Sequence, residues 1–165
     1  MQKLKGKSQS CVLILHNVRS VHNVGAIFRT ADAAGVVKIY LTGYTPAPLD
    51  RFGRARADLH KSALGAELTV PWEQREDVEQ LIQDLRFTIH EIEIIGLEQD
   101  KRAIDYKSYR PRKDFALIVG NEVGGIPKEI LDLCDKIIEI SMRGKKESLN
   151  VSVALGVALF QITGI

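Results

Sequence analysis

The chain has 165 residues, a length typical of one globular domain with a sizeable core. With 45% hydrophobic and 27% charged residues, its composition excludes a disordered or collagen-like chain. Cys11 and Cys134 are too few for a disulfide framework or a cysteine-based zinc site, which favours a reducing compartment, the cytoplasm. No stretch predicts a membrane span or a complete signal peptide, so we expect a soluble protein.

Charge is unevenly distributed along the chain. Lys and Arg total 23 against 21 for Asp and Glu, yet residues 73–100 hold nine acidic side chains against Arg75 and Arg86. An acidic face and a basic face would suit a polyanionic partner, although any single basic cluster can also be merely solvated. The basic clusters are Lys3, Lys5 and Lys7; Arg51, Arg54, Arg56 and Lys61; Lys107, Arg110, Arg112 and Lys113; and Arg143, Lys145 and Lys146.

The first part of the chain predicts a strand, a helix and a second strand. Cys11–Leu15 is a short apolar run of the kind found in buried strands, and a polar loop follows it. From Val24 onward, apolar residues recur at helical spacing, with Asn23 at the position of an N-cap and Gly35 at the end. Val36–Leu41 predicts the second strand.

The middle of the chain continues this alternation. A basic loop punctuated by Gly and Pro precedes a predicted short helix over residues 55–64 and a brief third strand over residues 68–71. Apolar residues at helical spacing predict a further helix over residues 78–85, and residues 91–97 predict a fourth strand.

The last part completes the predicted fold. Residues 115–119 and 137–140 are apolar runs of strand length, separated by a short helix over residues 127–133. Residues 149–162 form a closing helix that is apolar on nearly every side. We therefore expect an α/β fold, a mostly parallel sheet of about six strands with helices on both faces, in one domain spanning residues 1–165.

Ligands of such sheets bind beyond the carboxyl ends of the strands, so we examined the loops that follow strands. Three of them are unusually polar and glycine-rich: HNVRSVHNVG after Leu15, GNEVGG after Val119 and SMRGKKESLN after Ile140. The GxGxxG, Walker A and GxSxG patterns are all absent, which removes support for the common nucleotide folds and for a nucleophile elbow. The four histidines lack ligand spacing, so we predict no metal site.

Most of these loop residues have an ordinary structural explanation. Asn23, Ser148 and Asn150 can cap helices, and the glycines can form turns. Arg29 is more informative, because helical geometry points it away from the apolar face of its helix, either into solvent or into a cleft.

Taken together, HNVGAIFRTADAAGV, LIVGNEVGGIP and ISMRGKKESLNVSVALGVA resemble the three motifs of the SpoU-TrmH family of RNA ribose methyltransferases. The motifs stand in the family's order and cover nearly the whole chain. The resemblance implies the SPOUT fold with a trefoil knot at the carboxyl end. It also implies transfer of a methyl group from S-adenosylmethionine to a ribose 2′-hydroxyl of tRNA or rRNA. A homodimer is expected too, because one small sheet can cover only part of the closing apolar helix.

The resemblance also implies roles for particular residues. Arg29 corresponds to the family's proposed base, but a guanidinium resists deprotonation, so it could instead pair with RNA phosphate and stabilise the developing oxyanion. Asn23 would orient Arg29 or the ribose, and Glu122 would fix the second loop or bond to Arg29. Ser148 and Asn150 would hold the substrate side. The implied cofactor-binding residues are Leu97, Gly120, Ile140, Met142, Ser148 and Leu149.

Glycine at 120 and 124 would let the main chain approach the cofactor. We expect no added amino-terminal RNA-binding domain, so the domain itself must select its RNA. The loop with Arg51, Arg54, Arg56 and Lys61 is our candidate RNA-binding surface, assisted by the amino-terminal lysines. The alternative function is a non-catalytic RNA-binding or assembly protein, but such a protein needs a basic surface and not this set of polar motif residues.

Overall fold

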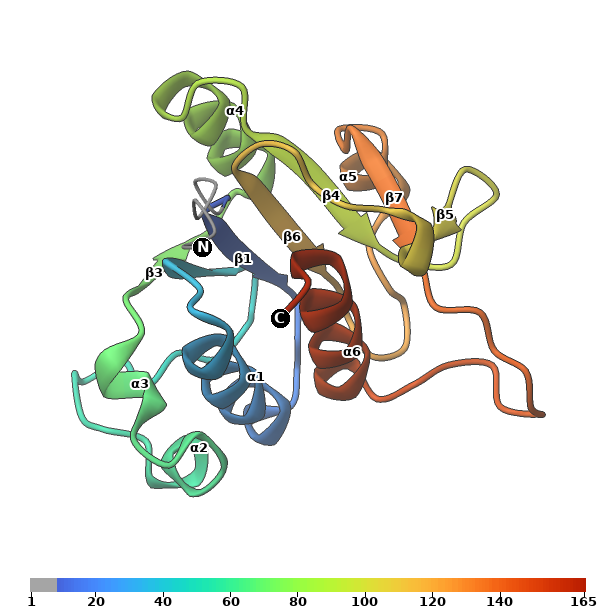
Figure 1. The fold of residues 1–165 in the computed structure, drawn as a ribbon. Helices are drawn as coiled ribbons and strands as arrows, with labels where there is room; N and C mark the ends of the chain where they lie inside the picture. The colour runs from blue at the N-terminus through green and yellow to red at the C-terminus, as the bar shows by residue number, and fades with distance from the viewer. Residues whose placement is uncertain (1–8) are drawn as a thin grey trace, which may run out of the picture.

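The computed structural model describes residues 9–165, which form a seven-stranded parallel sheet with helices on both faces (Figure 1). The strand order is β3-β2-β1-β6-β4-β7-β5, and each neighbouring pair is parallel. The strands are β1 (Cys11–His16), β2 (Lys38–Thr42), β3 (Trp72–Arg75), β4 (Glu93–Leu97), β5 (Ile104–Asp105), β6 (Phe115–Val119) and β7 (Lys136–Glu139). The helices are α1 (Val21–Ala34), α2 (Ala57–Ala63), α3 (Ala66–Thr69), α4 (Val78–Thr88), the 3-10 helix η1 (Tyr106–Ser108), α5 (Lys128–Leu131) and α6 (Val151–Thr163).

The central strands are buried on both faces, which explains their uninterrupted apolar sequences. In β1, Leu13 and Leu15 belong to one core, and Val12 and Ile14 belong to the other. Successive side chains of a strand point to opposite faces, so a continuous apolar run serves both cores at once. Helices α1, α2 and α6 cover the first core, and α4 and α5 cover the second.

The ends of α1 follow ordinary capping rules, with one correction to the sequence prediction. The N-cap is Ser20, whose Oγ accepts a hydrogen bond from the Asn23 amide at 3.2 Å. Asn23 therefore lies within the first turn, and its side chain is free for other contacts. Gly35 ends the helix as predicted, in the left-handed conformation with φ 71°.

The sheet has seven strands and not six, because the edge strand β5 was not predicted, and the other edge strand, β3, lies a few residues after the segment predicted for it. The segment predicted as a third strand is partly the helix α3, and the strand follows it as β3, whose sequence WEQR contains no apolar run. β5 has only two residues, both exposed. Edge strands bury little, so neither leaves a hydrophobic pattern in the sequence.

The remaining predicted elements are present with ends shifted by a few residues. The trefoil knot stays a prediction of the family resemblance. Lys3, Lys5 and Lys7 lie outside the described residues. Within residues 9–165, no helix is both long enough and apolar enough to cross a membrane.

Candidate active site

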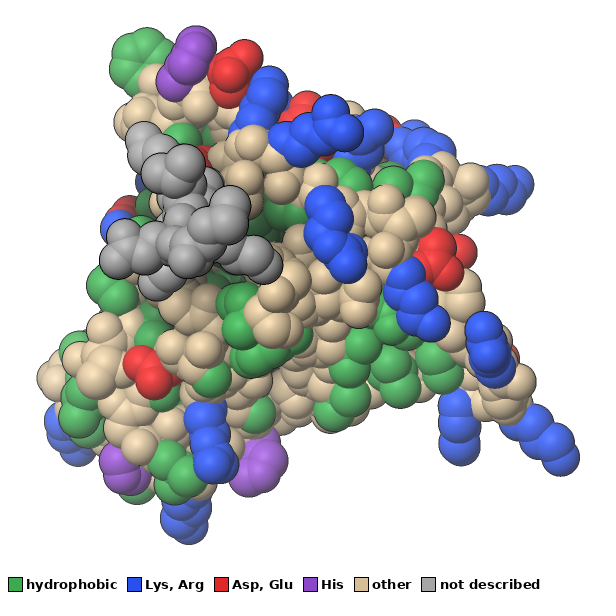
Figure 2. Space-filling model, viewed as in Figure 1, with side chains coloured by type: hydrophobic (Ala, Val, Ile, Leu, Met, Phe, Trp, Pro, Cys, Tyr) green, Lys and Arg blue, Asp and Glu red, His purple; other side chains and the backbone are tan. Residues whose placement is uncertain are grey.

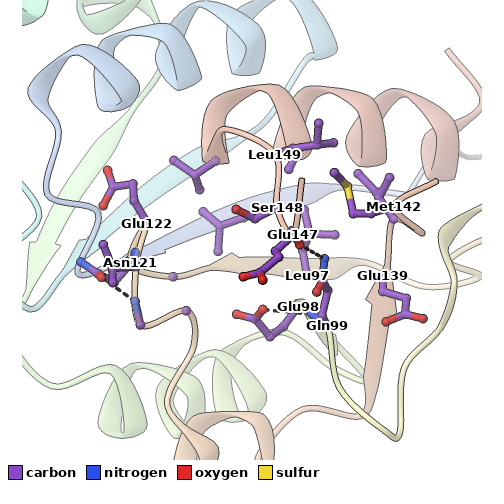
Figure 3. A pocket seen from close by; sticks show the side chains of 18 residues that line it. Leu97, Glu98, Gln99, Asn121, Glu122, Glu139, Met142, Glu147, Ser148 and Leu149 are labelled. Carbon is purple, nitrogen blue, oxygen red and sulfur yellow. Dashed lines mark hydrogen bonds between the residues drawn. The ribbon is translucent and has the colours of Figure 1, made fainter. Parts of the chain in front are cut away.

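The loops that follow β4, β6 and β7 meet around a cavity of about 310 Å³ at the carboxyl end of the sheet (Figure 3). α6 adds Val151 and Ala154 to its wall. Because parallel strands end at the same edge, segments far apart in sequence are brought together here. All six residues predicted to bind a cofactor line this cavity: Leu97, Gly120, Ile140, Met142, Ser148 and Leu149.

The cavity combines an apolar wall with acidic side chains. Leu97, Ile140 and Leu149 come from three different segments and form part of the apolar wall. The lining has no lysine or arginine, but it includes four glutamates: Glu98, Glu122, Glu139 and Glu147. Such a site suits a ligand with a flat apolar ring and positive charge.

The loop after β6 folds tightly on itself at Gly120. A Cβ at this position would lie 2.5 Å from the carbonyl carbon and oxygen of Gly125, too close for any side chain. At Gly124 the nearest atom to a Cβ would be the Asn121 Oδ1 at 3.7 Å, an ordinary contact. Gly120 lines the cavity, but its missing Cβ makes room for the protein's own main chain. That these glycines let the main chain approach a ligand stays a prediction.

Two carboxylates hold the loop after β6 in place. On one side, Glu98 Oε2 accepts a hydrogen bond from the Ile126 amide at 2.9 Å. On the other, Glu122 Oε2 and Oε1 accept from the amides of Arg19 and Ser20 at 3.0 and 3.1 Å. The loop is thus tied both to the end of β4 and to the start of α1.

Glu122 also begins a chain of side-chain contacts between the three motifs. Its Oε1 accepts a hydrogen bond from Asn23 Nδ2 at 3.1 Å. Asn23 Oδ1 in turn accepts one from Asn150 Nδ2, also at 3.1 Å. Asn150 is the N-cap of α6, with Oδ1 accepting from the amides of Ser152 and Val153. Three residues predicted for the site are therefore joined directly.

The pKa of Glu122 reflects these contacts. Desolvation by burial raises it, but hydrogen bonds from the Arg19 and Ser20 amides and from Asn23 outweigh that effect. The net result is a pKa below the ordinary value of 4.5. Glu122 is therefore ionised at neutral pH and serves as a hydrogen-bond acceptor.

Arg29 lies apart from this chain of contacts. Its side chain is exposed on α1, does not line the cavity and has no ion-pair partner or side-chain hydrogen bond within the described residues. The suggested bond from Glu122 to Arg29 is absent, and that carboxylate accepts instead from Asn23 and two main-chain amides. The prediction that Arg29 points away from the packed face of α1 is confirmed.

Comparison with known proteins adds to this geometry. Residues 10–160 match the SpoU rRNA Methylase family. The chain belongs to this family. It is 35% identical over 159 residues to the 23S rRNA (guanosine-2′-O-)-methyltransferase RlmB of Haemophilus influenzae, an alignment that covers 96% of this chain and 61% of that protein. The chain thus spans less than two thirds of that relative's length.

Two solved structures of RNA-modifying enzymes share the fold. An AdoMet-bound rRNA methyltransferase from Sinorhizobium meliloti aligns with a TM-score of 0.83 and 27% identity, covering 94% of this chain and 56% of that one. The TrmH/SpoU tRNA modifying enzyme of A. aeolicus aligns with a TM-score of 0.81 and 27% identity, covering 96% and 76% of the two chains. The expected SpoU-type α/β fold is confirmed.

The sequence did not predict three residues that hold the loops of this SpoU-family site together: Glu98, Asn121 and Tyr44. Asn121 Nδ2 donates to the carbonyl of Asn17 at 3.1 Å and to the hydroxyl of Tyr44 at 2.9 Å, which joins the loops after β1, β2 and β6. Asn121 stands inside the GNEVGG motif, so its position gave a signal. Glu98 and Tyr44 follow strands in the same way, and strand-end position alone could have nominated them.

The basic loop between β2 and α2 is less positive than its sequence indicates. Arg54 pairs with Asp50 at 2.9 Å, and Arg56 pairs with Asp58 at 3.2 Å. Arg51 and Lys61 are exposed and have no carboxylate partner within the described residues. The unpaired positive charge of this region therefore rests mainly on Arg51 in the loop and Lys61 in α2.

A second group of basic side chains lies beside the cavity. The loop after β7 projects from the molecule and carries Lys and Arg side chains at its tip (Figures 1 and 2). Its basic residues, Arg143, Lys145 and Lys146, are exposed, whereas Met142 and Ser148 of the same loop line the cavity. This loop thus presents positive charge next to the mouth of an acidic cavity.

Proposed function

We propose that this protein is an S-adenosylmethionine-dependent methyltransferase that methylates a ribose 2′-hydroxyl in RNA. The observation that carries the proposal is the hydrogen-bonded chain Glu122–Asn23–Asn150 beside a cavity lined by the other motif residues. A protein that only bound RNA would need a basic surface, but it would need neither this chain nor an acidic cavity.

The cavity fits S-adenosylmethionine by its chemistry. Leu97, Ile140 and Leu149 would enclose the adenine, and main-chain groups at the strand ends would bind its polar edge. Glu98, Glu139 and Glu147 would favour the positively charged sulfonium and ammonium groups. When bound, the cofactor supplies a methyl group on a sulfonium, which an oxygen nucleophile can attack. No metal takes part in this proposal.

Arg29 is proposed to act on the substrate side. A guanidinium stays protonated at neutral pH, so we favour pairing with RNA phosphate and stabilisation of the developing 2′-oxyanion over a role as general base. Asn23 would position the ribose, with Glu122 holding Asn23 in place. Ser148, which lines the cavity, and Asn150 would complete the substrate side.

A homodimer is part of the proposal. α6 buries Leu155, Ala158, Leu159 and Ile162, while Val153 and Val157 on the same helix remain 50% and 41% exposed. A second copy would cover this apolar strip, and the family resemblance implies that the partner completes the site. This would explain why the catalytic candidate Arg29 does not line the cavity of its own chain.

The RNA is proposed to be tRNA or rRNA, held by Arg51, Arg54, Arg56 and Lys61. We also infer a cytoplasmic location, which agrees with the free thiols of Cys11 and Cys134. The test of the activity uses methyl-labelled S-adenosylmethionine with total tRNA and with rRNA, followed by digestion to nucleosides. We expect label in a 2′-O-methylnucleoside. Label in a base, or cofactor binding without any transfer, would contradict the proposal.

A further inference from the structure

A small hairpin between β2 and α2 presents one aromatic side chain to solvent. Residues Leu49 and Ala55 form an antiparallel bridge, and the Asp50 amide donates to the Arg54 carbonyl at 2.8 Å. Asp50 Oδ1 accepts from the amides of Phe52 and Arg54 at 2.8 and 3.0 Å. The hairpin tip is thus fixed by its own hydrogen bonds, and it holds Phe52 65% exposed.

Two arginines lie over the Phe52 ring. The guanidinium carbon of Arg51 is 4.7 Å from the ring centroid, and that of Arg54 is 4.9 Å away. Asp50 also fixes Arg54, because its Oδ2 accepts from Arg54 Nε at 2.9 Å. Two planar cations therefore lie within 5 Å of an exposed aromatic ring on a preformed support.

This arrangement differs from ordinary exposure of an apolar residue. Phe87, near the end of α4, is 91% exposed, but no lysine or arginine lies over its ring in the described part of the chain. Unpaired nucleotides are bound by a similar combination, since bases stack on aromatic rings and guanidinium planes while phosphates pair with arginine.

Resting on the proposed function, we propose that Phe52 and its two arginines form a stacking site for an unpaired base of the RNA substrate. The base stacks on Phe52 or on a guanidinium plane over it, and Arg51 neutralises an adjacent phosphate. α1, which carries Arg29, lies between α2 and α6 in Figure 1, so the hairpin and the cofactor cavity stand on opposite sides of α1. The stacked nucleotide is therefore a different one from the nucleotide whose ribose is methylated.

The test compares the binding of total tRNA and of fragmented rRNA to the full chain at several salt concentrations. Phe52→Ala should weaken binding about 5- to 100-fold without changing the salt dependence, because stacking releases no counterions. Phe52→Trp should retain affinity, and Phe52→Leu should not. Arg51→Ala should instead change the slope of the logarithm of the binding constant against the logarithm of the salt concentration. We expect the magnitude of this slope to fall by about 0.7, the value for one phosphate contact on a single strand. Phe87→Ala is the matched control and should bind like the parent.

The outcomes separate this inference from the proposed function. If the parent binds RNA and transfers methyl groups, and Phe52→Ala binds RNA equally well, the stacking site is wrong and the function stands. If Phe52→Leu restores affinity, or if Phe52→Ala changes the mass measured by light scattering, the residue is an apolar or subunit contact and the inference is also wrong. If the parent binds neither RNA, the proposed function fails and this inference fails with it.

Discussion

Glu122 and Asn23 are 99 residues apart in sequence, yet the Asn23 side-chain Nδ2 donates to Glu122 Oε1 at 3.1 Å. This contact places the first motif against the second, and Asn150 adds the third through its own bond to Asn23. The contact therefore links the helix that bears Arg29 to the loops that line the cavity. Activity should depend on it even though Glu122 does not contact Arg29.

We expect Glu122→Ala to lower the free energy of unfolding by about 1–2 kcal/mol, because the Arg19 and Ser20 amides and Asn23 lose their acceptor. Methyl transfer should fall more than cofactor affinity. The folded pKa of Glu122 is lowered, so its stabilisation is complete above pH 4.5 and is lost as the pH falls through the folded value. Denaturation of the parent and of Glu122→Gln should be measured at pH 7 and below pH 4. The difference between their free energies of unfolding should be smaller at the acidic pH.

The control for this experiment is Glu129→Ala, which removes an exposed carboxylate of α5 that makes no side-chain hydrogen bond in the described structure. Equal stability and equal methyl transfer in the Glu122 and Glu129 variants would contradict the role given to Glu122.

The two glycines of the loop after β6 should respond differently to the same substitution. Gly120→Ala puts a Cβ 2.5 Å from the main chain of Gly125. We therefore expect the free energy of unfolding to fall by about 1–3 kcal/mol and cofactor binding to be lost. Gly124→Ala meets no atom closer than 3.7 Å and should stay within about 0.5 kcal/mol of the parent. Thermal denaturation and calorimetry with S-adenosylmethionine measure both effects. Similar behaviour of the two variants would argue against the tight turn at Gly120.

His16 should make stability depend on pH. Burial lowers the pKa of His16 from 6.5. The Thr42 hydroxyl donates to the Leu15 carbonyl, so His16 Nδ1–H donates to Thr42 Oγ1, and Nε2 accepts from Asn17 Nδ2. Since the folded pKa lies below the unfolded one, stability is complete above about pH 6.5 and is lost as the pH falls through the folded value.

His16→Gln should flatten the dependence of unfolding free energy on pH between about 7 and 5, whatever its effect on absolute stability. Urea denaturation across this range provides the measurement. Identical pH slopes for the parent and His16→Gln would show that another group is responsible.

The exposed strip of α6 should control subunit association. Val153→Asp combined with Val157→Asp places two charges on the strip, so we expect a monomer where the parent is a dimer. Leu68→Asp changes an exposed apolar residue of α3 and should leave the dimer intact. Light scattering at micromolar concentration reports the mass. A parent protein that is already monomeric would remove the dimer from the proposal.

Much of the fold could be predicted because the strands at the centre of the sheet are buried on both faces. β1 and β6 are continuous apolar runs, and α1 and α4 carry apolar residues at helical spacing. The edge strands β3 and β5 lacked such a pattern because they are mostly polar or exposed. The family resemblance supplied six residues that line one cavity, at the edge where the strands of the parallel sheet end.

The contacts of the site were harder to predict from sequence. Glu122 had several candidate donors, and only the folded chain brings Asn23 and the Arg19 and Ser20 amides to its carboxylate while leaving Arg29 apart. Arg54 and Arg56 counted as free charges in the sequence, but Arg54 pairs with Asp50 and Arg56 pairs with Asp58. Pairing of this kind depends on backbone geometry, which composition does not record.

The most direct test of the proposed mechanism measures methyl transfer to RNA and cofactor affinity side by side for the parent, Arg29→Ala and the control Lys101→Ala. Lys101 is an exposed basic residue between β4 and β5. Within residues 9–165 the exposed Arg29 side chain makes no hydrogen bond or ion pair and does not line the cavity, so cofactor affinity should be unchanged. Methyl transfer to the ribose 2′-hydroxyl should fall by about 100-fold or more, because stabilisation of the developing oxyanion is lost. Transfer by Arg29→Ala at the rate of the parent and of Lys101→Ala would contradict the mechanism.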